Sequence, residues 1–139
     1  MTRISPEEPA FDPDSFSPED AERALREGVA LFDAARYHEA HEAFERCWLA
    51  NEGGDADFFK GLIQAAICMH HYADGNIAGA RKLYAGHRRL LAPFLPAHRS
   101  LDLEAFLAEM QRVLGPASRS TPASFDPALR PRLQPRSQP

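Results

Sequence analysis

The sequence predicts an all-α fold of about five helices: two stacked helical hairpins of tetratricopeptide-like type, followed by a C-terminal helix. Between residues 17 and 114, apolar residues recur at the three- and four-residue spacing of helices. Capping residues and helix breakers separate these periodic stretches. A faint repeat at an offset of forty residues relates 32–44 to 72–84, and each copy spans the end of one helix, a tight turn and the next helix.

The chain of 139 residues is expected to have three parts. Three prolines with interspersed acids make residues 1–16 an extended acidic arm, which Phe11 and Phe16 can attach to the body. Residues 17–114 form the helical domain, which is large enough to bury a hydrophobic core. Six prolines make residues 115–139 an irregular tail.

The first two helices are expected over residues 17–35 and 37–49. Ser17 is a good N-cap, and Pro18 suits the first helical position. The acids that follow Pro18 complement the helix dipole. A glycine pair after residue 52 predicts an exposed loop behind the second helix.

The remaining helices are expected over residues 57–74, 76–91 and 102–114. Gly75 stops the first of them, and an Asn or Asp caps each of the other two. The first is apolar almost all round, so it is predicted to be the central, buried helix. His87 falls among apolar residues and is predicted to be a core or rim histidine. Two prolines break the chain before the last helix.

The composition indicates a cytoplasmic globular protein. The longest apolar stretch is far shorter than the ~20 residues that cross a bilayer, and the acidic N-terminus lacks the apolar core of a secretory signal. Cys47 and Cys68 lie in apolar helical contexts and are predicted to be buried free thiols in a reducing compartment. The net charge is −4, although residues 81–99 carry only basic charges. No nucleic-acid motif is present, and a nucleic-acid partner is not expected.

The predicted helix over 37–49 has a polar edge beside its apolar face. On a helical wheel, His41 falls between Tyr37 and Trp48, inside the apolar face. Glu45 lies at the edge of that face, and Glu42 lies further round. The edge of this helix therefore combines an imidazole with carboxylates, and it is expected to be partly buried.

The predicted central helix has one narrow polar stripe. Lys60, Gln64 and His71 fall within a sector of about 40°. Because unpaired buried polar groups are costly, this stripe needs partners, and the imidazole-carboxylate edge of the preceding helix is the expected one. His38 and His70 are expected to point away from this contact, His38 to solvent and His70 opposite the stripe.

Three sequence motifs carry most of these polar residues: HEAFERCW at 41–48, KGLIQAAICMHHYADGN at 60–76 and GARKL at 79–83. Together they resemble the small bacterial and archaeal family known as domain of unknown function 309, over roughly residues 20–95. The resemblance implies an all-helical fold, and it supports the positions of the candidate site. No activity is assigned to the family, so the resemblance implies no reaction.

Three interpretations of the polar residues remain open. In the first, they form a hydrogen-bonded network that fixes how the second and third helices pack, with Gly61, Gly79 and Ala80 as positions of close contact. The chain is then a binding or scaffold domain for a protein or peptide, and it needs no cofactor. The residues of this cluster are His41, Glu42, Glu45, Trp48, Lys60, Gln64, His71 and Asn76.

In the second interpretation, the chain is a metal-dependent enzyme, such as a hydrolase. His41 and Glu45 are one helical turn apart and can share a divalent metal ion, and His71 can complete a three-ligand site with an open position. Glu42 is then the candidate general base.

In the third interpretation, the chain binds a small anionic ligand. Lys60, Gln64 and His71 line the pocket, together with the start of the helix that Asn76 caps.

Overall fold

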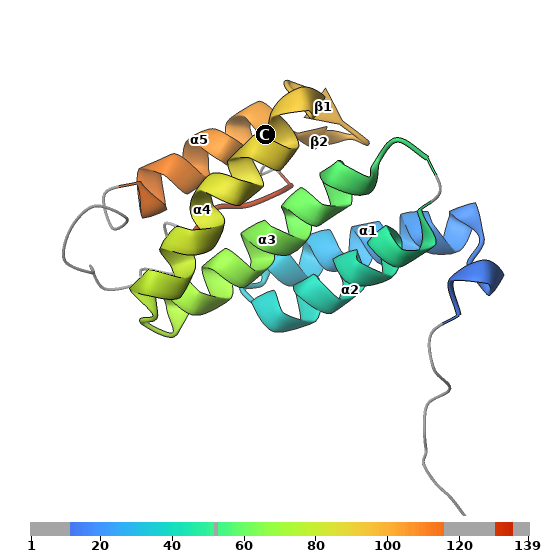
Figure 1. Cartoon of the computed structure of the whole chain (residues 1–139), viewed down its shortest axis with the longest axis horizontal. Coiled ribbons are helices and arrows are strands. Elements are labelled where there is room, and N and C mark those ends of the chain that lie inside the picture. Colours follow the sequence, from blue (N-terminus) through green and yellow to red (C-terminus); the bar gives the residue numbers. More distant parts are fainter. Residues whose placement is uncertain (1–11, 52, 116–129, 135–139) are drawn as a thin grey trace, which may run out of the picture.

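The structure of the chain, a computed structural model, describes residues 12–51, 53–115 and 130–134. Its five α-helices are α1 (Pro18–Asp33), α2 (Tyr37–Ala50), α3 (Ala56–Ala73), α4 (Ile77–Leu91) and α5 (Leu103–Leu114). Figure 1 shows α3 in the centre, with α1 and α2 on one side and α4 and α5 on the other. The predicted all-α fold of five helices is confirmed, because each helix begins and ends within about two residues of its expected bounds.

Side-chain caps fix three of the helix starts. At α1, Ser17 Oγ accepts a hydrogen bond from Asp20 N, and the Asp20 carboxylate accepts one from Ser17 N, both at 3.0 Å. Asn76 Oδ1 at α4 and Asp102 Oδ1 at α5 each accept the backbone N–H three residues further on, again at 3.0 Å. These bonds satisfy N–H groups that a helix start leaves without a backbone partner.

The turn between α1 and α2 is the same as the turn between α3 and α4, forty residues later. Each contains one residue of positive φ, Ala35 at 64° and Gly75 at 82°. In each, the next residue, Arg36 or Asn76, donates its backbone N–H to the carbonyl five residues earlier, at 2.8 Å. The repeat in the sequence therefore corresponds to a repeated helix–turn–helix geometry.

The core lies around α3, which contributes nine buried residues of its 18. Small residues bring neighbouring helices close to one another. A Cβ on Gly28 would lie 2.5 Å from Cε1 of Phe44, and one on Gly61 would lie 2.7 Å from Cδ2 of Leu91. Close contact at Gly61 agrees with the prediction. The largest fully buried side chains are Phe32, Phe44, Phe58, Phe59 and Phe106.

A small hairpin that the sequence did not predict lies between α4 and α5. This stretch contains η2 (Ala92–Phe94), β1 (Ala97–His98) and β2 (Leu101–Asp102), and the two strands pair antiparallel. Arg99 and Ser100, at φ 49° and 67°, form its turn. Asp55, in the connection between α2 and α3, accepts hydrogen bonds from His98 Nε2 at 3.0 Å and from Arg99 Nε at 2.5 Å. The hairpin is thereby attached to the distant α2–α3 connection.

The described parts of the two ends differ from the sequence-based expectation. Within the arm expected to be extended, η1 (Pro13–Ser15) is a short 3-10 helix, and Phe16 packs against the core. Phe11 lies outside the described residues. Residues 130–134 form no helix or strand, and Leu133 is buried in the core.

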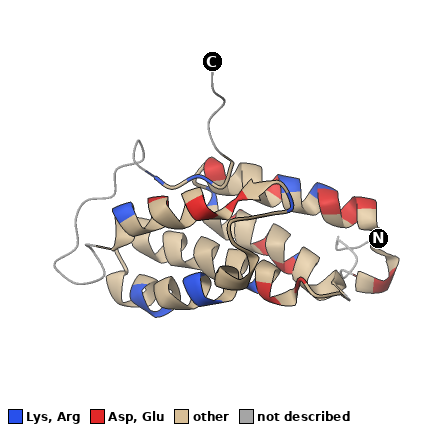
Figure 2. Ribbon diagram, turned by 90° about the horizontal axis from the view of Figure 1, so that it is seen from above, with Lys and Arg blue, Asp and Glu red and all other residues tan. Residues whose placement is uncertain are grey.

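Charges are unevenly distributed over the described surface. The helix α4 carries Arg and Lys side chains and no acid, whereas Figure 2 shows Asp and Glu at the end of the molecule that bears the N-terminus. None of the helices in the described part of the chain has the length and apolar character needed to cross a membrane.

Candidate functional site

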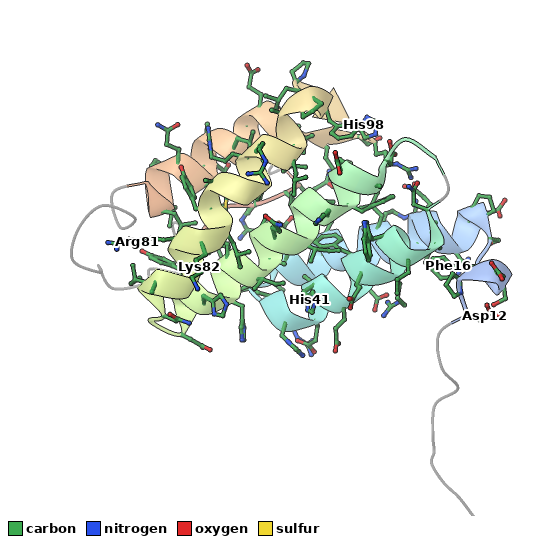
Figure 3. The ribbon with its side chains drawn as sticks, in the orientation of Figure 1. Asp12, Phe16, His41, Arg81, Lys82 and His98 are labelled. Carbon is green, nitrogen blue, oxygen red and sulfur yellow. The ribbon has the colours of Figure 1, made fainter. Side chains whose placement is uncertain are left out.

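The motif residues of α2 form a stripe that faces outward. Of the His41 side chain 23% is exposed, and of the Glu45 side chain 49%. Trp48, which is 38% exposed, lies two turns from His41 on the same side of the helix. Glu42 is exposed beside them. Figure 3 shows His41 where α2 borders α3. This stripe is accessible to a partner.

The polar stripe of α3 is not joined to that edge of α2 as expected. A Cβ on Gly86 of α4 would collide with Oε1 of Gln64, and one on Gly79 would lie 2.9 Å from Cδ2 of His71. Gln64 and His71 therefore cover two glycines of α4, while Lys60 is exposed. The two glycines leave space on α4 for these side chains, and a helical wheel of α3 alone does not show this space.

His71 and Asn76 have a local role at the start of α4. Asn76 Nδ2 lies 3.2 Å from Nδ1 of His71, while its Oδ1 accepts the N–H of Gly79. The buried Ala80, a predicted contact position, accepts a hydrogen bond from Cys68 Sγ at 3.3 Å. These contacts fix the packing of α4 on α3.

The three candidate metal ligands do not share a site. His41 Nε2 and Glu45 Oε1 are 3.8 Å apart on α2, whereas His71 contacts Asn76 at α4. In the part of the chain that the structure describes, no group of three or more His, Cys, Asp or Glu side chains is placed to hold a metal ion.

The residues expected to bind an anion differ in exposure and in the helix that they face. Lys60 is exposed, whereas Gln64 and His71 are half-buried at the α3–α4 contact. The two cavities described below are lined by none of these three residues.

Three histidines instead line a small pocket between α2 and α3, which we call the histidine pocket. Its volume is about 160 Å³. The His38 ring centroid lies 5.8 Å from that of His41 on the same helix and 5.8 Å from that of His70 on α3. The full lining is Tyr37, His38, His41, Ile67 and His70.

Each histidine of this pocket has a carboxylate one helical turn further along its own helix. The pairs, measured from Nε2 to the nearer carboxylate oxygen, are His38–Glu42 at 3.5 Å, His41–Glu45 at 3.8 Å and His70–Asp74 at 3.6 Å. All three carboxylates are largely exposed. The pocket thus has walls of imidazole, phenol and aliphatic carbon, and a rim of negative charge.

His38 is 64% exposed, as expected from the sequence, and His70 lies on the side of α3 away from the polar stripe, also as expected. The sequence did not predict that these two histidines meet His41 at a pocket between α2 and α3. A signal was present, because the spacing of a histidine followed four residues later by an acid occurs at 38/42, at 41/45 and at 70/74. Each such pair interacts along one helix face.

His87 is buried in the core, and its prediction as a core or rim histidine is confirmed. Its ring packs on Tyr84 and Phe106, with centroids 5.4 and 6.2 Å away. Within the described chain, neither ring nitrogen makes a hydrogen bond of good geometry. Burial lowers the pKa of His87 to about 4, and the nearby carbonyls of Leu83 and Tyr84 oppose only part of this effect.

Both cysteines are buried free thiols, as predicted. Burial raises the pKa of Cys47 to about 11 and that of Cys68 to about 12. Because the thiolate is the reactive form of cysteine, both side chains are structural in the folded protein.

These observations define the class of protein: a small all-α domain with an accessible, histidine-lined face between α2 and α3. The model of the family described as "Domain of unknown function (DUF309)" matches residues 25–83. The matched stretch, 59 of the 139 residues, includes the three motifs that resemble this family. The match includes the whole histidine pocket, whereas α5 and residues 130–134 lie outside it. No curated protein matches the chain.

Proposed function

We propose that this chain is a helical protein-binding domain and that its α2–α3 face binds a polypeptide partner. In this proposal the histidine pocket receives one apolar side chain of the partner, and the surrounding carboxylates attract its basic residues. The observation that carries the proposal is the pocket itself, in which histidines from two helices meet; the exposed Trp48 lies two turns further along α2.

The size of the pocket supports a side chain over a metabolite. Pockets for small molecules usually measure roughly 300–1,000 Å³, whereas the histidine pocket measures about 160 Å³. Tyr37 and Ile67 supply apolar walls, and the imidazole rings supply flat faces and hydrogen-bonding nitrogens. A single apolar or aromatic side chain matches this combination.

The charge around the pocket supports a basic partner. Glu42, Glu45 and Asp74 are exposed at its rim, and no Lys or Arg is among the lining residues. Carboxylates at a rim steer cationic partners and disfavour anions. This arrangement argues against a small anionic ligand at this face and in favour of a segment containing Lys or Arg.

The exposed side chains near the end of α2 support a protein partner. Trp48 is 38% exposed and Leu49 is 48% exposed. Tryptophan is enriched among the residues that dominate the energy of protein–protein interfaces. His41 and Trp48 are seven residues apart, and the pocket and the indole are therefore separated by roughly 10 Å along α2, within the reach of one bound segment.

The repeated turn supports the tetratricopeptide-like architecture that we propose for the domain. In such arrays, stacked helical hairpins present a continuous surface for peptides. We also propose a reducing, cytoplasmic setting, which the two buried free thiols Cys47 and Cys68 support.

The test is a selection with random dodecapeptides displayed on phage, panned on the immobilised full chain. We expect enrichment of peptides with one apolar or aromatic anchor flanked by Lys or Arg. A synthetic peptide of the selected sequence should lose roughly thirty-fold in affinity with Trp48→Ala, as expected of a central interface residue. His70→Ala should also weaken binding. Lys82→Ala, on the exposed surface of α4, is the matched control and should bind normally.

Each alternative has its own signature in the same experiment. If no peptide is enriched, or if selected peptides bind folded Trp48→Ala and His70→Ala as they bind the wild type, the proposal is wrong. Binding that requires added zinc and is abolished by a chelator would replace it with a metal site. Circular dichroism of each variant establishes that it is folded.

A further inference from the structure

Residues 130–134, with the sequence RPRLQ, are held by carboxylates from two helices. The Asp33 carboxylate at the end of α1 accepts the backbone N–H groups of Leu133 at 2.7 Å and of Gln134 at 3.0 Å. Glu109 on α5 accepts the N–H of Arg132 at 2.7 Å. Three consecutive backbone donors of this segment, which bends at Leu133 and Gln134, are therefore bound by side chains of the helical body. These hydrogen bonds recognise main-chain N–H groups and do not depend on the side chains of the segment.

Side chains of the same segment add an apolar anchor and a charge. Leu133 is only 1% exposed, and Pro131 is also buried. Arg130 Nε donates a hydrogen bond to the carbonyl of Asp33 at 3.1 Å. This carbonyl is at the C-terminal end of α1, where the helix dipole favours a cation. Position by position, the contacts recognise an Arg-Pro-x-Leu pattern.

The carboxylate of Asp33 is partly removed from water by this contact. Burial raises the pKa of Asp33, although the two hydrogen bonds from Leu133 and Gln134 act in the opposite direction. A buried carboxylate is stable only with such donors. The two backbone N–H groups therefore offset part of the cost of burying Asp33.

A groove continues from the bound segment along α1. Its volume is about 510 Å³, and Gln134 forms part of its lining beside Asp33. The groove is bounded on its far side by Arg99, Ser100 and Leu101 of the hairpin region, and its lining also includes Glu22 and Arg26. Leu25, Val29, Ala30 and Leu101 make its floor apolar. Residues 130–134 thus occupy one end of a longer cleft.

We propose that this cleft is a docking site for a polypeptide segment with the pattern Arg-Pro-x-Leu followed by an apolar residue, and that residues 130–134 are its resident ligand. A partner protein carrying this pattern displaces the resident segment. The extra apolar side chain of the partner covers the floor around Leu25 and Val29. This site is separate from the histidine pocket, and the proposal stands independently of the function proposed for that pocket.

A partner protein must compete with the resident segment for the cleft. The resident segment belongs to the same chain as the cleft, so it rebinds as an intramolecular ligand. A partner must bind more tightly than the resident segment to displace it. The free length of the groove gives a longer segment additional apolar contacts, which is why we assign the site to a partner that extends beyond the resident sequence.

The test uses two labelled peptides and the full chain. The first peptide has the sequence of residues 128–136, and the second is the same except for Leu in place of Gln134, the residue that lines the groove. By fluorescence anisotropy, both should bind full-length Leu133→Asp, whose own segment is released, at least tenfold more tightly than the wild type. The second peptide should bind about tenfold more tightly than the first. Asp33→Asn in the same background should weaken both, and a peptide with Asp in place of Leu133 should not bind.

Two results would overturn the proposal. Folded Leu133→Asp that binds neither peptide at millimolar concentration would make residues 130–134 a fixed part of the core. Equal affinity of the two peptides would exclude the groove from the site. Wild-type chains that exchange their segments and elute as dimers would identify a second copy, in place of a partner protein, as the occupant.

A second variant keeps the test decisive if Leu133→Asp does not fold. A protease site inserted between residues 122 and 123 of the full chain allows the connection to be cut after folding. Release of the C-terminal fragment on dilution, with helical circular dichroism retained and peptide binding gained, would support the proposal. Unfolding on release, or a fragment that never exchanges with the peptides, would contradict it.

Discussion

Replacing the buried His87 with leucine tests how this histidine makes stability depend on pH. The pKa of His87 falls from 6.5 to about 4 on folding. The unfolded chain therefore binds a proton at a pH where the folded chain does not, and the folded state loses stability as pH falls below 6.5. A pKa difference of one between the two states corresponds to about 1.4 kcal/mol. From pH 7.5 to pH 5, this one residue removes roughly 2 kcal/mol of wild-type stability, by linkage.

The assay is urea unfolding of the wild type and of His87→Leu at pH 7.5 and at pH 5. At pH 7.5 the variant should be at least as stable as the wild type, because the ring nitrogens make no good hydrogen bonds and the surroundings of Tyr84 and Phe106 are apolar. At pH 5 its advantage should grow by roughly 2 kcal/mol. A stability difference that stays constant within about 0.5 kcal/mol between the two pH values would refute the reasoning, since linkage requires the difference to change.

Three further predictions concern packing, capping and thiol reactivity. Gly28→Ala should destabilise the fold by about 1–2 kcal/mol in urea unfolding, because the new methyl group overlaps the buried ring of Phe44, and this outweighs the gain in helix propensity. Asn76→Ala should lower stability by about 1 kcal/mol, since α4 loses its side-chain cap; an unchanged midpoint would contradict this role. Cys47 and Cys68 should react with a thiol reagent at pH 8 only as fast as the protein opens, and at once in denaturant, because both are buried with raised pKa values; fast labelling of the native protein would contradict their burial.

Helix positions could be predicted because their signals are local. Ser17 with Pro18, and Gly75 with Asn76, are read by rules that involve only neighbouring residues, and the structure contains the expected caps. The offset of forty residues was also visible in the sequence. It correctly aligned the two turns, although one uses Ala35 in a left-handed conformation where the other uses glycine.

Two packed segments gave no usable local signal. The hairpin turn at Arg99 and Ser100 has positive φ at both residues, a conformation that sequences usually mark with Asn or Gly. Its attachment to Asp55 is forty-four residues distant in sequence. In residues 130–134, five residues are too few to show a periodicity, and the prolines indicated only an irregular tail. Long-range contacts fix both segments.

The candidate site shows a different limit of sequence reasoning. A wheel of α3 correctly groups Gln64 with His71, but it does not say which neighbouring helix they face. The answer lies in α4, where Gly79 and Gly86 are seven residues apart, the same spacing as between Gln64 and His71. Helices that run antiparallel then place each polar side chain over one glycine. Sequence analysis of α3 without α4 assigned this stripe to α2.

A double-mutant cycle measures whether this matching of spacings determines the packing. Gly86→Ala adds a methyl group that collides with the Gln64 amide, but this amide is the far end of a flexible side chain. The gain of about 1 kcal/mol in helix propensity should therefore be largely offset in the wild-type background. In a Gln64→Ala background the collision is absent, and Gly86→Ala should stabilise the fold by about that full amount. The expected coupling between the two positions is thus roughly 0.5–1 kcal/mol by urea unfolding.

His71→Ala, two turns away over Gly79, is the matched control and should show no coupling with Gly86→Ala. Equal effects of Gly86→Ala in all three backgrounds would mean that the space at Gly86 does not position the Gln64 side chain. The contact of Gln64 with α4 would then contribute nothing measurable to the free energy of unfolding.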